Sequence, residues 1–277
     1  MFRTLVDVET LSAHGGDPNW VVVDCRHALG DLARGRRLYD EAHIPGAYFV
    51  DFERVLTGTK TGTNGRHPLP DPAALEGYLQ SIGVNDDTQL VAYDDGADMF
   101  AARFWFCMRW IGHDAVAVLD GGIAAWRAAG KPLSGAMPTP THFGTITARA
   151  NAELLVDVDF VQSHLGDAAT RILDARGPDR FAGQNETIDP VGGHIPGATN
   201  RHYALNYDES GRFKSADALR EEFAAFGRSS SIVHQCGSGV SATVNLLAME
   251  HAALRGSRLY AGSWSEWVSD PTRPTAK

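Results

Sequence analysis

The sequence predicts an α/β protein made of two copies of one domain, each a parallel β-sheet flanked by helices. First, the motif at residues 22–26 (Val-Val-Asp-Cys-Arg) recurs at residues 172–176 (Ile-Leu-Asp-Ala-Arg). Second, His-Ile-Pro-Gly-Ala stands at residues 43–47 and again at residues 194–198, so both motifs recur in one order at nearly one separation. Third, short apolar runs alternate with longer helix-like stretches, which is typical of α/β folds.

In the first copy, β-branched and apolar runs predict strands at residues 21–23, 90–93 and 115–119. Longer stretches between them predict helices at residues 72–82 and 99–111. Parallel strands that are buried on both faces read as continuous apolar runs, because neither face meets water. We therefore expect each sheet to be parallel and covered by helices on both sides.

Two further matches extend the duplication toward the end of each copy. Residues 90–94 align with residues 232–236, and the segment at residues 121–126 aligns with residues 262–267. Four matches in the same order indicate that the whole domain is duplicated, because one short motif recurs by chance far more easily than an ordered series.

The length of the chain and a proline-rich segment predict where the copies divide. A chain of 277 residues is long for one core and ordinary for two domains. Residues 132–141 are rich in proline and show no periodicity, as expected of a connection. We expect a non-catalytic domain at residues 1–135, a linker at residues 136–150 and a catalytic domain at residues 151–277.

Composition excludes several classes of protein. A formal charge of −9 and an isoelectric point near 5.6 argue against a nucleic-acid or membrane-surface partner. Three cysteines without a CxxC pair indicate neither a disulfide framework nor a metal site. The start of the chain turns acidic before an apolar leader forms, and no run of apolar residues is long enough to span a membrane. We expect a cytoplasmic protein.

The most informative segment is an apolar strand that runs into a cysteine-headed loop. Residues 232–235 are followed by Cys236, and then by Gly237, Ser238, Gly239, Val240 and Ser241, near which a helix begins. The glycines let backbone amides turn inward, and a helix N-terminus adds partial positive charge. We therefore expect the sulfur of Cys236 to ionise easily and to sit in a partly exposed, electropositive site.

Other cysteines and histidines have simpler interpretations. Cys25 and Cys107 stand inside apolar runs, so we expect them to be unreactive core residues. His43 and His194 each precede Ile-Pro-Gly, which fits a turn with proline second and glycine third. We expect both histidines to form structural hydrogen bonds.

Together these motifs resemble the tandem rhodanese sulfurtransferases over nearly the whole chain. The segment from Cys236 to Ser241 is similar to the Cys-Gly-Ser-Gly-Val-Thr loop of the 3-mercaptopyruvate branch, whereas the thiosulfate branch has arginine and lysine after its cysteine. The resemblance implies that the loop residues bind the sulfur donor. It also implies a silent first copy, in agreement with the carboxylate of Asp94 at the position of Cys236.

The resemblance also implies roles for residues outside the loop. Asp51 and His67 match the pair that the mercaptopyruvate branch combines with the loop serine, here Ser238, in a proton relay. Arg180 matches the arginine that meets the donor carboxylate. The chain departs from the pattern at residues 183–190, where a second arginine is expected and no basic residue occurs.

These residues predict a double-displacement sulfur transfer. The Cys236 thiolate would take a sulfur from 3-mercaptopyruvate, release pyruvate, and pass the sulfur from a persulfide to a small thiol, a thioredoxin-like protein or cyanide, with no cofactor. Thiosulfate:cyanide sulfurtransfer is the alternative within the class, and an inactive rhodanese-like binding module is an alternative outside it. A cysteine phosphatase is disfavoured because Ala242 stands where such an enzyme needs a phosphate-binding arginine.

Overall fold

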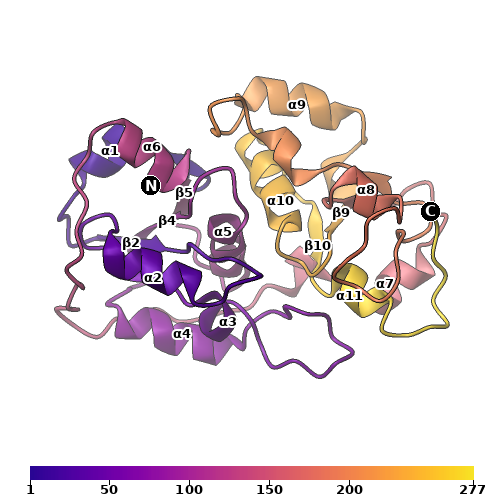
Figure 1. Cartoon of the computed structure of the whole chain (residues 1–277), viewed down its shortest axis with the longest axis horizontal. Helices are drawn as coiled ribbons and strands as arrows, with labels where there is room; N and C mark the ends of the chain where they lie inside the picture. Colours follow the sequence, from indigo (N-terminus) through magenta and orange to yellow (C-terminus); the bar gives the residue numbers. More distant parts are fainter. The chain divides into compact units, whose positions relative to one another are not determined.

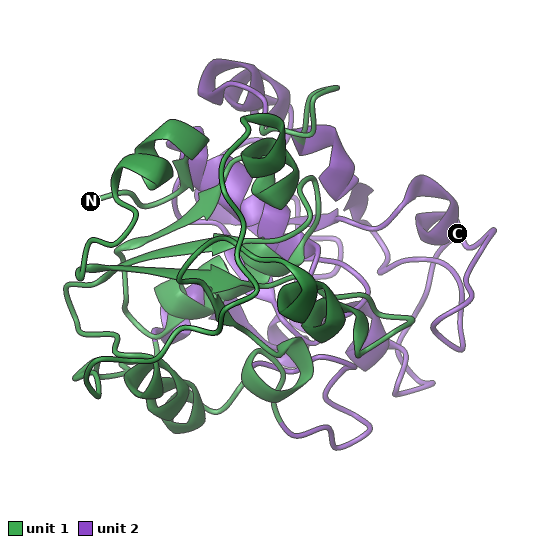
Figure 2. Cartoon of the chain, turned by 60° about the vertical axis from the view of Figure 1, so that its left-hand side comes forward, with its two compact units in different colours: residues 1–58, 70–150, 207–213 green, residues 59–69, 151–206, 214–277 purple.

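The computed structural model describes all 277 residues and divides them into two compact units (Figures 1 and 2). Unit 1 comprises residues 1–58, 70–150 and 207–213, and unit 2 comprises the remaining residues. Each unit contains one five-stranded parallel sheet with helices around it. The predicted α/β class and the duplicated parallel-sheet architecture are therefore confirmed.

In unit 1, the strands lie in the spatial order β1-β5-β4-β2-β3 and pair only in parallel. Their bounds are β1 Leu5–Val6, β2 Trp20–Asp24, β3 Tyr48–Phe49, β4 Gln89–Tyr93 and β5 Val116–Leu119. The helices are α1 Val8–Ala13, α2 Arg34–Glu41, α3 Phe52–Val55, α4 Pro72–Ser81, α5 Phe100–Trp110 and α6 Gly122–Ala128. Every strand and helix predicted in the first copy is present, with ends shifted by at most one residue.

In unit 2, the order β6-β10-β9-β7-β8 repeats that of unit 1 strand for strand. The strands are β6 Leu155–Val156, β7 Arg171–Asp174, β8 Thr199–Asn200, β9 Ile232–Gln235 and β10 Arg258–Tyr260. The helices are α7 Val158–Ser163, α8 Pro178–Phe181, α9 Ala216–Ala224, α10 Ala242–His251 and α11 Ser263–Trp267, with short 3₁₀ turns at η1 Ala152–Leu154, η2 Tyr203–Asn206 and η3 Ser229–Ser231. None of the helices in the chain combines the length and apolar character that crossing a membrane requires.

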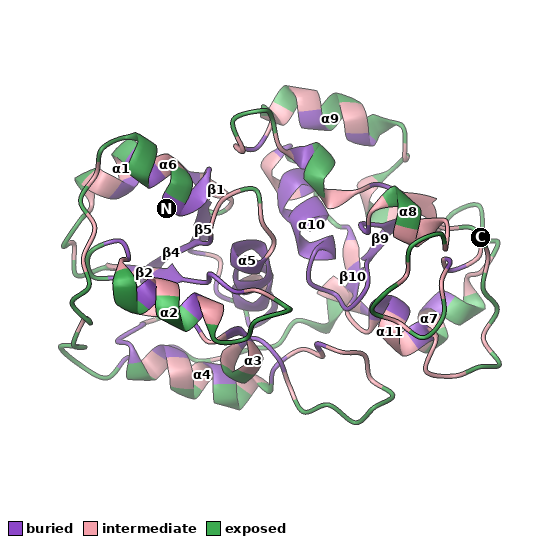
Figure 3. Cartoon of the chain, viewed as in Figure 1, coloured by how far each residue is buried: buried purple, intermediate pink, exposed green.

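The central strands are buried on both faces, as continuous apolar runs predict. In β4, Leu90 and Ala92 point to one face and Val91 and Tyr93 to the other, and all four are fully buried. Helices α5 and α10 pack against the central strands of their own units and are themselves buried along most of their length (Figure 3). The carboxyl end of β9 is therefore a fixed point from which a loop can leave toward α10.

Two segments belong to a different unit from the one their position in the sequence suggests. Residues 59–69 precede the expected boundary at residue 135 but pack in unit 2, and residues 207–213 pack in unit 1. The first segment is held by hydrogen bonds such as that from the Arg66 amide to Ser265 Oγ, at 3.0 Å. A boundary drawn from composition alone misses such exchanges, because it divides the chain only once.

The segment expected to be a linker follows the surface of unit 1. The Gly144 amide donates to the carbonyl of Gln80 at 2.8 Å, and the Ile146 amide donates to the carbonyl of Val84 at 3.1 Å. The later part of residues 136–150 therefore has backbone partners, although the segment forms neither helix nor strand.

The repeated turn has the same conformation in both units. Gly46 and Gly197 both have positive φ, 79° and 81°, as the third position of a type II turn requires. His43 Nδ1 lies 2.7 Å from the carbonyl of Tyr39, and His194 Nδ1 lies 2.9 Å from the carbonyl of Phe181. Both histidines thus form the structural hydrogen bonds that we expected.

Candidate active site

The loop headed by Cys236 is held in place by hydrogen bonds to the backbone amide and the backbone carbonyl of Cys236. The Cys236 amide donates to Ser263 Oγ at 3.1 Å, and its carbonyl accepts from the Trp264 amide at 3.0 Å. Gly239 has a φ of 74°, and a Cβ on it would lie 2.3 Å from the carbonyl oxygen of Ala261. Only glycine fits that position, because any side chain would collide with backbone. The sequence thus forces a tight turn between β9 and α10.

Four amides of the loop are left without acceptors in the protein. The N–H groups of Gly237, Ser238, Val240 and Ser241 donate to no protein atom, and the loop leads directly into α10. Buried backbone amides rarely lack partners, so a group of them at a helix N-terminus is suited to bind an anion. This arrangement fits the anionic sulfur that the sequence predicts at the head of the loop.

Cys236 is more buried than expected. Its exposed fraction is 2%, so the expectation of a partly exposed thiol is wrong for this structure. Two arginines pack on the next residue: a Cβ on Gly237 would lie 2.8 Å from Arg66 Nη2 and 3.6 Å from the terminal nitrogens of Arg180. Two guanidinium groups therefore lie beside the loop and take up space there.

The other two cysteines are core residues. Cys25 and Cys107 are buried, and burial raises the pKa of both thiols. Because a raised pKa leaves almost no thiolate at neutral pH, neither is a candidate nucleophile. No group of three or more His, Cys, Asp or Glu side chains is arranged to hold a metal ion.

The structure brings together two of the three residues of the predicted relay. His67 Nδ1 lies 2.7 Å from Ser238 Oγ, and both side chains are buried. Asp51 is described in unit 1, where it caps α3: its carboxylate accepts from the Arg54 amide at 3.1 Å. The hydrogen bond joins His67 to the cysteine loop, whereas the structural role of Asp51 is that of a helix cap.

Arg180 lies beside the loop, held by acidic residues from the segment that follows α8. Its Nε and Nη2 donate to Glu186, with distances of 2.9 to 3.0 Å. The Glu186 carboxylate also accepts from the amides of Ile188 and Asp189, at 2.9 and 3.0 Å. Glu186 is therefore fixed by both backbone and guanidinium contacts.

Arg66 supplies a second guanidinium that the sequence analysis did not find. Asp189 bridges the two arginines: Oδ1 accepts from Arg66 Nη1, and Oδ2 accepts from Arg180 Nη2 at 3.2 Å. The second arginine was expected within residues 183–190, but it comes from a distant part of the chain. Its position next to His67 was the one available signal in the sequence.

The two carboxyl groups in this cluster have pKa values that move in opposite directions. Burial disfavours the charged form of Glu186, but the amides of Asp189 and Ile188 and the charge of Arg180 outweigh it and lower its pKa. Burial raises the pKa of Asp189, although Arg66 and Arg180 oppose that shift. Asp189 is therefore the less firmly stabilised anion of the two.

The equivalent loop of unit 1 carries a carboxylate in place of the thiol. Asp94 follows β4, and its oxygens accept from the amides of Gly96 and Ala101, both at 3.0 Å. Burial raises the pKa of Asp94 to about 6. This loop has no nucleophile, which fits a silent first copy.

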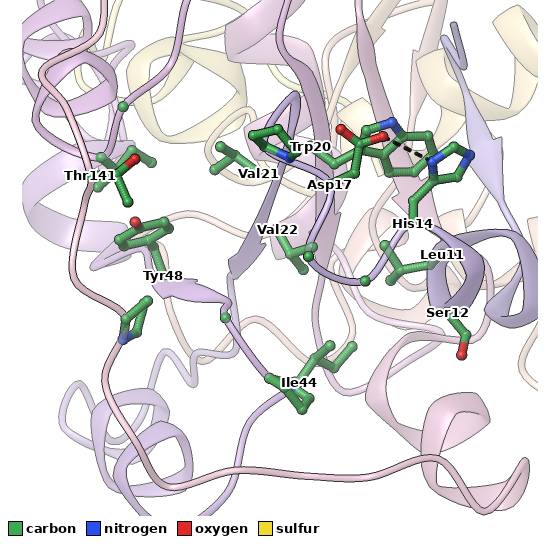
Figure 4. Close-up of a pocket in the computed structure, with 18 of the residues that line it drawn as sticks. Leu11, Ser12, His14, Asp17, Trp20, Val21, Val22, Ile44, Tyr48 and Thr141 are labelled. Atoms are coloured by element: carbon green, nitrogen blue, oxygen red, sulfur yellow. Dashed lines mark hydrogen bonds and ion pairs between the residues drawn. The ribbon is translucent and has the colours of Figure 1, made fainter.

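One cavity of unit 1 contains none of the predicted site residues. It has a volume of about 530 Å³ and is lined by residues of α1, β2 and the proline-rich segment. Figure 4 shows Trp20, Val22 and Tyr48 on its wall, with His14 and Asp17 joined at 3.3 Å. No residue of the cysteine loop lines this cavity.

In one of the two similar α/β units, a cysteine precedes a glycine-containing loop at a helix N-terminus. This arrangement is typical of proteins with thiol-dependent group-transfer chemistry. The family model described as the rhodanese-like domain matches residues 7–129 and 157–270. The chain belongs to the rhodanese family, and the predicted family is confirmed.

Relatives match over almost the full length. The chain is 46% identical to a probable 3-mercaptopyruvate sulfurtransferase of Pseudomonas aeruginosa, covering 98% of this chain and 97% of the relative. It is 36% identical to the putative thiosulfate sulfurtransferase SseB of Mycobacterium tuberculosis, covering 95% and 92%. The crystal structure of SseA from Escherichia coli, a 3-mercaptopyruvate sulfotransferase, aligns with a TM-score of 0.82 at 32% identity, covering 95% of this chain and 99% of SseA.

Proposed function

We propose that this chain transfers a sulfane sulfur from 3-mercaptopyruvate, through a persulfide on Cys236, to a thiol or to cyanide. The observation that carries the proposal is the set of uncommitted amides at Gly237, Ser238, Val240 and Ser241, directly after the cysteine. Such a cradle stabilises a thiolate before transfer and the terminal sulfur of a persulfide after it. Relatives named for 3-mercaptopyruvate support this donor over thiosulfate.

The first half-reaction forms an S–S bond and breaks a C–S bond. The Cys236 thiolate attacks the sulfur of 3-mercaptopyruvate, and the electron pair of the C–S bond leaves with carbon as the enolate of pyruvate. The enolate then takes up a proton. In the second half-reaction an acceptor thiolate or cyanide attacks the outer sulfur, which returns Cys236 as thiolate. Each half-reaction balances without a metal or an organic cofactor, and ping-pong kinetics follow.

Ser238 and His67 are suited to move the proton that this sequence requires. Their hydrogen bond, at 2.7 Å, connects the loop to an imidazole, the side chain that titrates nearest neutral pH. Asp51 remains a predicted third member. The variant Asp51→Asn tests it, because asparagine also caps a helix but carries no charge. A relay role requires slower turnover with unchanged thermal unfolding, whereas a purely structural role leaves turnover unchanged.

Arg180 is suited to anchor the carboxylate of the donor. A guanidinium offers two parallel N–H donors to a carboxylate, and this one lies against the loop at Gly237. We assign it as the anchor for the α-keto acid end of 3-mercaptopyruvate, with the loop amides receiving the sulfur end.

Intact-mass measurement tests the reaction class. Brief exposure to 3-mercaptopyruvate should add one sulfur atom to the chain, and Cys236→Ser should abolish the gain, while Cys107→Ser serves as the matched control and should retain it. No gain with any donor would support an inactive binding module instead.

Thiosulfate is the second candidate donor, because the cluster of Arg66 and Arg180 suits any small anion and several relatives, SseB among them, are named for thiosulfate. Kinetics with both donors at equal concentration separate the two activities. A higher kcat/KM with thiosulfate would overturn the choice of 3-mercaptopyruvate.

A further inference from the structure

We infer that Asp189, held between Arg66 and Arg180, occupies the site of the donor carboxylate as an internal anion that the donor must displace. The inference rests on the proposed function and names the residues that set the affinity for its donor. It adds Asp189 as a built-in competitor of the donor at the two arginines.

The geometry of Asp189 is that of a bound carboxylate. Each of its two oxygens takes one guanidinium, Oδ1 from Arg66 and Oδ2 from Arg180. The carboxylate is buried, with 3% of its side chain exposed, whereas Arg66 and Arg180 retain 29% and 21% exposure. A ligand can therefore reach the arginines from solvent, and its carboxylate would make the same two contacts.

The site adjoins the reacting sulfur. Both guanidiniums lie against Gly237, which follows Cys236 directly in the chain. In 3-mercaptopyruvate the carboxylate is separated from the sulfur by a carbonyl and a methylene group. A donor held by Arg66 and Arg180 thus presents its sulfur to the neighbouring residue, which is the nucleophile.

Asp189 is the member of the cluster that can leave. Glu186 is tied to two backbone amides in addition to Arg180, so moving it would break the turn at residues 186–189. The Asp189 carboxylate has guanidinium partners alone, and burial raises its pKa despite them. The donor therefore exchanges one carboxylate for another, and the arginines stay paired throughout.

Steady-state kinetics with 3-mercaptopyruvate measure the contribution of Arg66. Arg66→Gln should raise KM by about tenfold to a hundredfold with kcat little changed, since it removes a charged hydrogen bond to the donor. Arg66→Lys should have a KM between those of the wild type and Arg66→Gln, because lysine keeps the charge but lacks the planar guanidinium. Arg255→Gln, at an exposed arginine of the same unit, is the matched control and should leave KM unchanged.

The competitor role of Asp189 predicts a change of opposite sign. Asp189→Asn should lower KM several-fold, because the internal anion no longer competes. Asp217→Asn, at an exposed carboxylate on α9, is the control. A higher KM in Asp189→Asn would show that Asp189 only positions the arginines, and would overturn the competitor role.

Alkylation of Cys236 tests the anion site without any sulfur transfer. The readout is the ratio of alkylation rates with iodoacetate, which carries a carboxylate, and iodoacetamide, which is neutral and of similar size. The ratio should fall in Arg66→Gln and rise in Asp189→Asn, with unfolding temperatures checked in each variant. An unchanged ratio in both variants would overturn the inference even if sulfur transfer is observed. The expected ratios in a chain that transfers no sulfur would support the anion site and reject the proposed function.

Discussion

His234 predicts how the stability of unit 2 depends on pH. It lies in β9, two residues before Cys236, is fully buried, and neither ring nitrogen has a hydrogen-bond partner. Burial, reinforced by the charge of Arg201, lowers its pKa from 6.5 to about 3. The histidine is therefore neutral when folded over a pH range in which the unfolded chain binds a proton.

The sign and size of the effect follow from this difference. Because the unfolded state binds the extra proton, the folded state is not penalised at this position above pH 6.5. The unfolding free energy then decreases as the pH falls from 6.5 toward 3. The loss amounts to about 1.4 kcal/mol for each pH unit. At about pH 5 the buried histidine should therefore cost about 2 kcal/mol of unfolding free energy relative to neutral pH.

Urea denaturation of the wild-type chain and of His234→Leu measures this directly. The variant has no titrating group at this position, so its stability should fall less between about pH 7 and about pH 5, by about 2 kcal/mol. His142→Leu, at an exposed histidine, is the control and should keep the wild-type dependence. Equal pH dependence in wild type and His234→Leu would refute the reasoning, since it would mean that the buried ring is not held neutral.

Three further substitutions test the site and its support. Gly239→Ala should lower the unfolding free energy by about 1–3 kcal/mol in chemical denaturation and slow sulfur transfer, because φ is positive and a Cβ would meet the Ala261 carbonyl; unchanged values would show that the turn relaxes. His67→Gln should lower kcat by about a hundredfold or more in steady-state assays if the imidazole moves a proton, and a change confined to KM would contradict that role. Arg176→Met should cost about 3–5 kcal/mol in urea denaturation, because it leaves the carboxylate of Asp174 buried without its 2.7 Å partner; a loss below about 1 kcal/mol, the value of an exposed ion pair, would contradict it.

Much of the fold could be predicted because its signals are local or repeated. The alternation of apolar runs with helical stretches reflects burial of each strand on both faces, and the duplicated motifs mark matching turns in both sheets. The cysteine loop was visible for the same reason, since strand, loop and helix follow one another within residues 232–251. Contacts within a short segment leave their pattern in consecutive residues.

The remaining site features depend on contacts between distant segments. Arg66 meets Asp189 across 123 positions of the chain, and no periodicity connects the two. The sequence shows that residues 183–190 lack a basic residue. It does not show that Asp189, within this segment, binds the two arginines. The arginines that pack on Gly237 also come from outside the loop, so the sequence of the loop alone does not show which side chains surround it.

The two copies contain equivalent loops that begin with different side chains, Asp94 in unit 1 and Cys236 in unit 2. In unit 1, the carboxylate of Asp94 takes the amides of Gly96 and Ala101 for itself, yet burial still raises its pKa to about 6. Backbone amides alone therefore do not cancel the cost of burying an anion at this turn. In unit 2 the amides of Gly237, Ser238, Val240 and Ser241 are uncommitted, and the guanidinium groups of Arg66 and Arg180 pack on Gly237, the residue after the cysteine. Replacing a carboxylate by cysteine would not by itself make the first loop active, because a buried nucleophile there also needs the neighbouring arginines.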